Sequence, residues 1–117
     1  MRFDEQRPDA ALTITGYGPA GWRVGGEVWP DGVLVTPDAA VALLGGLTLA
    51  QLAPLAAQGV EVLLLGTGPT LVRDAALLKA LAEARLAVDV MDSKAAARTY
   101  NVLVSEGRRV AAALLPV

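Results

Sequence analysis

Two polar loops in the second half of the chain hold the residues best suited to bind a small anion. The first loop, Gly66, Thr67 and Gly68, follows the apolar run at residues 60–65 and precedes a helical pattern at residues 74–85. A helix that begins after such a turn offers free N–H groups and a partial positive charge, which favour phosphate or carboxylate. The glycines permit close backbone approach, and the Thr67 hydroxyl adds a hydrogen-bonding group.

The second loop, Asp92 and Ser93, follows the next apolar run at residues 86–91. In nucleotide-binding folds, an acidic residue ~20 positions after the glycine loop can hold a ribose hydroxyl. Asp92 lies somewhat later than that, but at the corresponding end of its strand. If the two runs are neighbouring parallel strands, both loops lie at the sheet edge where open α/β sheets bind ligands. The alternative is an ordinary strand-to-helix turn, with Asp92 as the N-cap of the next helix.

A different stretch, GYGPAG from Gly16 to Gly21, matches the dinucleotide fingerprint G-x-G-x-x-G letter by letter. That fingerprint needs a helix directly after the loop. Here WRVGGEVW follows, which has no helical period, and Pro19 removes one backbone donor. We therefore interpret GYGPAG as a glycine-rich hairpin turn and not as a nucleotide site.

A third group of polar residues lies on a helix predicted from residue 93 to about residue 103. Lys94 and Arg98 are like charges one helical turn apart, which a nearby acid such as Glu106 or a partner's carboxylate would relieve. We interpret Thr99 and Tyr100 as packing and local hydrogen-bonding residues. The alternative reading is a solvated helix face. The candidate binding residues of this segment are Arg98, Thr99, Tyr100, Asn101, Glu106 and Arg108.

The chain contains no cysteine and no histidine. Disulfides, thiol nucleophiles, Cys/His zinc sites and Ser-His-Asp triads are therefore impossible within it. Among acid–base side chains only Asp, Glu, Lys and Tyr remain, and no spacing pairs them convincingly. We predict no catalytic residue, no metal site and no cofactor, and we leave open whether the chain catalyses a reaction.

These residues must be positioned by the elements around them. The first third reads as short strands at residues 12–15, 22–24, 27–29 and 33–35, separated by glycine-rich turns. Thr36 and Pro37 suggest the start of a helical turn that ends at Gly45, and Thr48 with Gln51 matches a capping box. From residue 60 the order is β-α-β-α-β, which favours parallel pairing of its first two strands. The expected class is α/β.

At 117 residues, with 54% hydrophobic residues, the chain is expected to be a single domain over residues 1–117. The net charge of −2 argues against a nucleic-acid binder. The opening residues MRFDEQRPDAAL do not resemble a secretory signal, and no apolar stretch approaches the ~20 residues that span a bilayer. We expect a soluble, cytoplasmic protein.

The segments LLLGTG and VDVMDSKAAARTYNVLVSEGRRVAAALL resemble a small single-domain family that includes a mitochondrial complex I assembly factor and a vertebrate adipogenesis-associated protein. The resemblance covers residues 33–115 and is strongest from residue 60 onward. It implies a three-layer fold with a mixed central sheet and no established enzymatic activity. It also implies work through protein partners, as in the mitochondrial member. The positions that carry it are Gly66, Thr67, Gly68, Met91, Asp92, Ser93, Ala95, Ala96, Arg98, Thr99, Tyr100, Asn101, Leu103, Glu106, Gly107 and Arg108.

Two functions remain in competition. The favoured one is a non-enzymatic interaction or assembly factor with an unidentified protein partner, whose binding surface would include Arg98, Glu106, Arg108 or exposed Trp22 and Trp29. The alternative is a binder of, or an enzyme acting on, a small anionic or nucleotide-like molecule at the Gly66–Thr67–Gly68 loop. Whether the chain is a monomer or a homodimer is left open.

Overall fold

The computed structural model describes residues 11–117. The charged opening segment, on which the expectation about a signal sequence depended, lies almost wholly outside the described residues. Eight strands, α1, α2, α3 and the 3-10 helix η1 make up the described chain. In chain order they are β1 (Ile14–Gly18), β2 (Gly21–Val24), β3 (Glu27–Trp29), β4 (Val33–Val35), β5 (Ala40–Ala42), α1 (Leu49–Leu52), η1 (Ala53–Gln58), β6 (Val62–Gly66), α2 (Ala75–Glu83), β7 (Val88–Met91), α3 (Ser93–Ser105) and β8 (Val110–Leu114).

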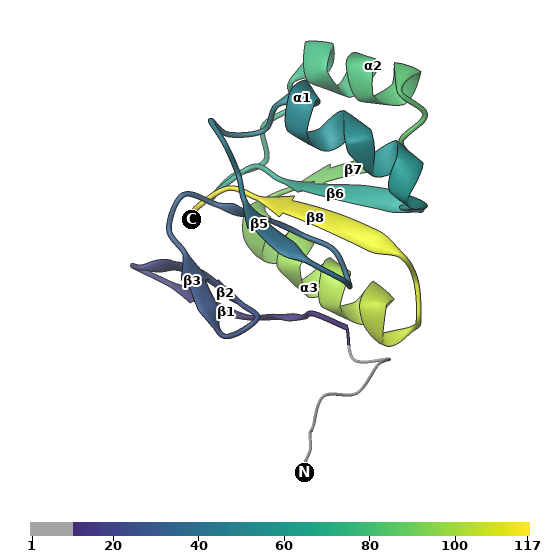
Figure 1. Ribbon diagram of the computed structural model, residues 1–117. Coiled ribbons are helices and arrows are strands. Elements are labelled where there is room, and N and C mark those ends of the chain that lie inside the picture. Colours follow the sequence, from purple (N-terminus) through teal and green to yellow (C-terminus); the bar gives the residue numbers. More distant parts are fainter. Residues whose placement is uncertain (1–10) are drawn as a thin grey trace.

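The central sheet has five strands in the order β5-β4-β8-β6-β7. β6 is parallel to both β7 and β8, whereas β4 is antiparallel to β5 and β8. The mixed sheet and the parallel pairing of β6 with β7 are therefore confirmed. The α1 and α2 helices cover one face of this sheet and α3 covers the other (Figure 1). The three-layer α/β prediction is thus correct.

Continuous apolar runs form the central strands because both faces of the sheet are buried. In β6, Leu63 and Leu65 face the α1–α2 layer while Leu64 faces α3. The short alanines of β8 alternate in the same way, with Ala112 on the α3 side. Two hydrophobic cores result, one on each face of the sheet.

The first three strands form a separate antiparallel sheet, β1-β2-β3, which packs beside α3 (Figure 1). The GYGPAG stretch is the hairpin between β1 and β2, as the sequence indicated. Pro19 and Ala20 form its turn. The register of β1 against β2 shifts between Ile14 and Gly16, which is a β-bulge at Thr15.

The prediction of a helical turn that starts at Thr36 and Pro37 is wrong. The Thr36 hydroxyl accepts hydrogen bonds from the backbone N–H groups of Asp38 and Ala39, and the chain then turns directly into β5. A threonine before a proline favours a helix start and a hydroxyl-capped turn alike, because both use the same short-range hydrogen bonds. At Thr48 the helix does begin as predicted, with its hydroxyl accepting from Gln51 N–H. The Gln51 side chain, however, accepts from the Leu44 N–H and donates to the Ala42 carbonyl. It therefore does not reach back to the Thr48 N–H, and only half of the capping box forms.

Candidate functional site

The two loops named from the sequence meet at the end of β6 and β7. The backbone N–H of Gly68 donates to Ser93 Oγ at 2.8 Å, and the Ser93 N–H donates back to the Gly68 carbonyl at 2.9 Å. The Thr67 N–H donates to the Met91 carbonyl at 3.0 Å. Gly66, Thr67, Gly68, Asp92 and Ser93 are therefore neighbours, because parallel strands end at the same sheet edge.

The polar groups at this edge are largely engaged with one another. Asp92 is the N-cap of α3 and accepts from the Ala95 N–H at 2.9 Å, and the hydroxyl of Ser93 is fully buried. A Cβ on Gly66 would lie 2.9 Å from the Ser93 Cα, so the strand and the helix start are in close contact there. These contacts join β6 to α3, and an anion at the loop would have to replace some of them.

Tyr100 lies in the core of the α3 layer. Its side chain is fully buried, and its hydroxyl donates to the Leu12 carbonyl at 2.9 Å. Burial, with a smaller contribution from the Asp38 carboxylate, raises the pKa of this hydroxyl above its ordinary value. The neighbouring Thr99 hydroxyl contacts Met91 Sδ at 3.6 Å. Both residues lie within packed contacts between α3 and the strands.

The free energy of unfolding at high pH should depend on the ionisation of the buried Tyr100 hydroxyl. The folded pKa of Tyr100 is above the unfolded one, so its contribution is intact below pH about 10 and is lost as the pH rises beyond that. Above pH about 10, the free energy of unfolding of the wild type should therefore fall faster than that of Tyr100→Phe, by up to about 1.4 kcal/mol per pH unit. Urea unfolding of both proteins from pH 8 to 11.5 measures the difference. Parallel curves would contradict the assignment.

Asn101 fixes β1 against α3. Its side-chain oxygen accepts the Ile14 N–H at 2.9 Å, and its side-chain nitrogen donates to the Ile14 carbonyl at 2.8 Å. The amide thus contacts the outer edge of β1 as the peptide group of a neighbouring strand would. No local sequence signal pairs two residues 87 positions apart, so this contact was not foreseen.

Beyond Asn101, β1 and α3 border a groove of about 270 Å³. Trp22 and Tyr17 stand in it at a ring-centroid distance of 5.4 Å, and Lys94 Nζ lies 4.7 Å above the centroid of the Tyr17 ring. Lys94 and Arg98 are exposed, as is nearly half of Tyr17. The residues that line the groove are Ile14, Thr15, Gly16, Tyr17, Trp22, Lys94, Ala97, Arg98 and Asn101.

The expectation that both tryptophans are exposed is wrong. Trp22 is 2% exposed, and its Nε1–H donates to the Leu115 carbonyl at 3.0 Å. Trp29 is half-buried and donates to the Val24 carbonyl at 3.2 Å. A tryptophan in a short alternating strand gives no local sign of which face another layer will cover. Of the two aromatic residues facing the groove, the exposed one is Tyr17.

Glu106 and Arg108 lie just beyond the C-terminal end of α3, which is about 10 Å along the helix axis from Arg98. Arg108 forms an ion pair with Glu61 at 2.7 Å, and both side chains are about half exposed. The hydrogen bond from Arg108, with a second one from the Arg109 N–H, lowers the pKa of the Glu61 carboxyl. Arg98 and Arg108 therefore do not form one anion clamp.

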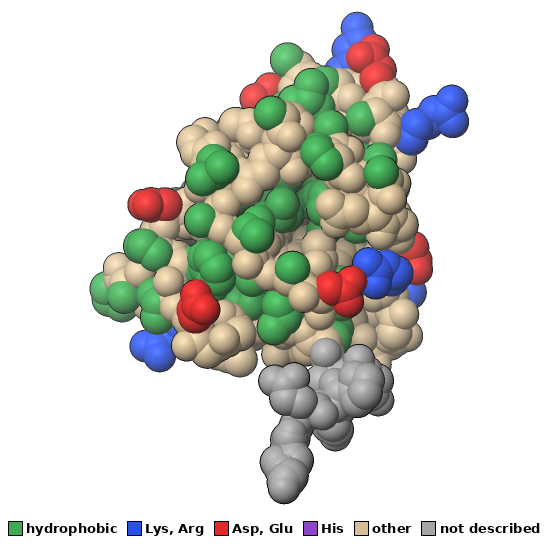
Figure 2. Space-filling view, viewed as in Figure 1, with side chains coloured by type: hydrophobic (Ala, Val, Ile, Leu, Met, Phe, Trp, Pro, Cys, Tyr) green, Lys and Arg blue, Asp and Glu red, His purple; other side chains and the backbone are tan. Residues whose placement is uncertain are grey.

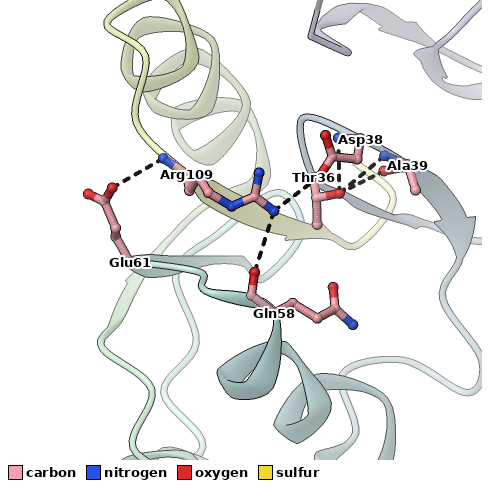
Figure 3. Close-up of polar contacts among 6 residues, drawn as sticks. All are labelled: Thr36, Asp38, Ala39, Gln58, Glu61 and Arg109. Carbon is pink, nitrogen blue, oxygen red and sulfur yellow. Dashed lines mark hydrogen bonds and ion pairs between the residues drawn. The ribbon is translucent and has the colours of Figure 1, made fainter.

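A polar cluster surrounds Arg109 at this same end (Figure 3). The Arg109 guanidinium pairs with Asp38 at 3.0 Å and donates to the Gln58 carbonyl at 3.4 Å. Its backbone N–H donates to Glu61 at 3.4 Å. The cluster ties the turn before β5 to the end of η1 and the start of β8. Its side chains are exposed, and such pairs contribute little to stability.

An apolar surface lies elsewhere on the molecule, beside β5 and α1. Leu44 is 71% exposed, and Val41 and Leu49 are exposed as well. Figure 2 shows hydrophobic side chains gathered across the middle of this face, with most charged side chains near its rim.

Among residues 11–117, no three acidic side chains gather closely enough to hold a metal ion. None of the helices in the same range combines the length and the hydropathy needed to cross a bilayer.

Comparison with known proteins adds three findings. The model of a family described as "Protein of unknown function (DUF498/DUF598)" matches residues 14–115. An uncharacterized protein of Rhodobacter capsulatus is 44% identical over 92% of this chain and 86% of its own length. The NADH dehydrogenase [ubiquinone] 1 alpha subcomplex assembly factor 3 of Danio rerio is 33% identical over 96% of this chain and 68% of its own.

A solved structure shares the fold. The crystal structure of an outer membrane protein from Bartonella henselae has a TM-score of 0.79 and 32% sequence identity, and the match covers 92% of this chain and 96% of that one. The family resemblance drawn from the sequence motifs is thus confirmed.

Proposed function

This chain belongs to the DUF498/DUF598 family, and from that membership we propose that it works by holding a protein partner, as an assembly factor does. The observation that carries the proposal is the similarity to the assembly factor of Danio rerio over 96% of the chain. A relation over almost the whole fold favours a shared mode of action more than a shared motif would. Proteins of one fold can differ in function, because function resides in particular surfaces, so the proposal requires a specific binding surface on this chain.

The groove between β1 and α3 is the surface we propose for the partner. Tyr17 is a large aromatic side chain with 47% of its surface exposed, and Arg98 and Lys94 lie beside it. Tyrosine and arginine are enriched among the residues that anchor protein interfaces. Four of the candidate residues, Arg98, Thr99, Tyr100 and Asn101, are consecutive on α3. Of these, Arg98 and Asn101 line the groove.

Quantitative affinity capture tests the proposal. Tagged wild-type chain, expressed in the cells that naturally make it, should recover a reproducible set of proteins. The charge-reversed groove variant, Lys94→Glu with Arg98→Glu, should lose that set. The matched control, Arg73→Glu with Lys79→Glu, places the same charge change on exposed residues before and within α2 and should retain it.

Two outcomes would overturn the proposal in different ways. If wild-type chain recovers no reproducible protein, partner binding itself is wrong. If the groove variant keeps the partners while Leu44→Glu loses them, partner binding is right and the surface is the apolar one beside β5. Leu44 suits this purpose because its side chain is exposed, so the substitution should leave the core intact.

The alternative function, a small-anion site at Gly66, Thr67 and Gly68, makes a separate prediction. Since Gly68 N–H is bonded to Ser93 Oγ and Thr67 N–H to Met91, we expect sulfate, phosphate and nucleotides to leave the melting temperature unchanged. A ligand at 100 times its dissociation constant would add about 2.7 kcal/mol, a shift of several degrees. A shift of that size in the wild type would favour the anion site instead.

A further inference from the structure

Within residues 11–117, β1 is an edge strand whose outer side is covered only in part. In the sheet order β1-β2-β3, one side of β1 pairs with β2 and the other side faces α3. The Asn101 side chain accepts from the outward N–H of Ile14 and donates to its outward carbonyl. This is direct evidence that the outer edge of β1 points toward the helix and accepts a peptide-like partner there.

Further along the strand, the outward groups of Tyr17 have no such partner within residues 11–117. Gly18 and Gly21 face one another across the turn of Pro19 and Ala20, so the backbone groups of Gly18 point toward β2. Because the direction alternates along an antiparallel pair, the N–H and carbonyl of Tyr17 point toward the open edge. An open edge of this kind is a template for one more strand.

The two glycines that flank Tyr17 leave this edge unobstructed. A Cβ on Gly18 would have no neighbour within 4 Å, and a Cβ on Gly16 would meet only Arg23 Cδ at 3.9 Å. Neither glycine has the positive φ that would demand the residue, unlike Gly21. Glycine inside a strand often marks a bulge, a tight bend or a place where another backbone approaches closely, and here Gly16 adjoins the bulge at Thr15 while Gly18 adjoins the turn.

Two adjoining hollows run along the same edge. The groove of about 270 Å³ borders Gly16, and a second hollow of about 420 Å³ borders Gly18, Pro19 and Pro69. Tyr17 and Lys94 line both hollows. Among the described residues, no Asp or Glu side chain lines either hollow, while Lys94 supplies positive charge to both and Arg98 to the first. The two hollows together form one trough, and its positive charge suits an extended chain with acidic side chains.

We propose that an extended, acidic segment of the protein partner adds as a strand to the free edge of β1, hydrogen-bonding the backbone of Tyr17 and placing carboxylates on Lys94 and Arg98. Main-chain hydrogen bonds supply affinity in this mode, and alternate side chains supply specificity. Asn101 marks the end of the added strand because it already occupies the edge at Ile14. The inference rests on the proposed function and names the chemistry of the partner.

A defined peptide tests the binding mode without knowledge of the partner. The probe is the acetylated and amidated peptide VEVEVEVE, titrated into ¹⁵N-labelled full chain and followed by NMR. We expect shifts confined to β1, the first half of α3 and the residues around Pro69 and Val117 that line the second hollow, and slower hydrogen exchange of the Tyr17 amide. The basic peptide KVKVKVKV should cause neither change. Lys94→Glu with Arg98→Glu should weaken binding of the acidic peptide by about tenfold or more, and Arg73→Glu with Lys79→Glu should not.

A second probe separates strand addition from simple charge attraction. The same acidic peptide with alternate backbone nitrogens methylated keeps its charges but loses the donors on one edge, and it should bind about tenfold more weakly. Equal binding of the methylated peptide, no response of Tyr17, or equally tight binding of a poly-U RNA would overturn the inference. If partner capture still depends on Lys94 and Arg98 in that case, the proposed function stands and only the strand addition fails.

Discussion

Replacing Gly21 with alanine should destabilise this protein by about 3 kcal/mol or more. Gly21 has a φ of +128°, which L-residues rarely adopt, and such strain costs ~1–3 kcal/mol. The new methyl group would also collide with the Trp29 carbonyl oxygen and lie 2.7 Å from Pro30 Cα. Overpacking against backbone atoms that cannot move aside adds ~1–3 kcal/mol. The last glycine of the GYGPAG stretch is therefore required by the β1–β2–β3 sheet and needs no ligand to explain it.

The matched control is Gly18→Ala in the same hairpin. Its new methyl group would meet open space, and its φ is not positive. The free energy of unfolding should stay within about 1 kcal/mol of the wild type, on the stabilising side, because alanine restricts the unfolded chain. Urea denaturation of the three proteins at neutral pH measures both effects. Equal stabilities of Gly21→Ala and Gly18→Ala would show that the hairpin does not impose the geometry described.

The second large effect is expected for Gly66→Ala at the end of β6. The added methyl group would lie 2.9 Å from three atoms: Ser93 Cα, Ser93 Oγ and Leu114 Cδ2. Since one of these belongs to the helix backbone, the strand and α3 must separate slightly. We expect a loss of about 2 kcal/mol, in the usual range for overpacking. Gly16→Ala is the control, because its new methyl group would meet a single atom at 3.9 Å.

Combining Gly66→Ala with Ser93→Ala tests whether the two residues act as one contact. Ser93→Ala alone leaves the Gly68 N–H without its buried acceptor and should cost ~1–3 kcal/mol. The double variant should lose less than the sum of the two single variants, because removing Oγ relieves one of the three clashes. Strict additivity would mean that the loop and the helix start do not touch as described. If Gly66→Ala leaves the free energy of unfolding unchanged, the interpretation of this loop as an open ligand site is favoured again.

The architecture from β6 onward was predictable because its signals are local. Asp74 and Asp92 each accept from the N–H three residues later, so both helix starts form from neighbouring residues. The apolar runs around Leu63 and Val110 are uninterrupted because both faces of each strand are covered. The meeting of Gly68 with Ser93 follows from the rule that parallel strands end at one edge.

The N-terminal half was harder because its signals serve more than one structure. Thr36 before Pro37 suits a helix start as well as the capped turn that actually precedes β5. Trp22 and Trp29 lie in strands too short to reveal which face is buried. The sequence in this region could therefore predict short strands and glycine turns, but not their sorting into a second sheet.

By itself, the sequence determined the α/β class, the starts of α2 and α3, the strand-to-helix loops and the family, since each depends on residues close together in the chain or on a contiguous motif. Tertiary structure alone decided that β8 inserts between β4 and β6, and that Glu61 pairs with Arg108. It also decided that Asn101 covers the edge of β1 only at Ile14. Such contacts join segments far apart in the chain. Which of them forms depends on the packing of all layers at once, and no local pattern records that choice.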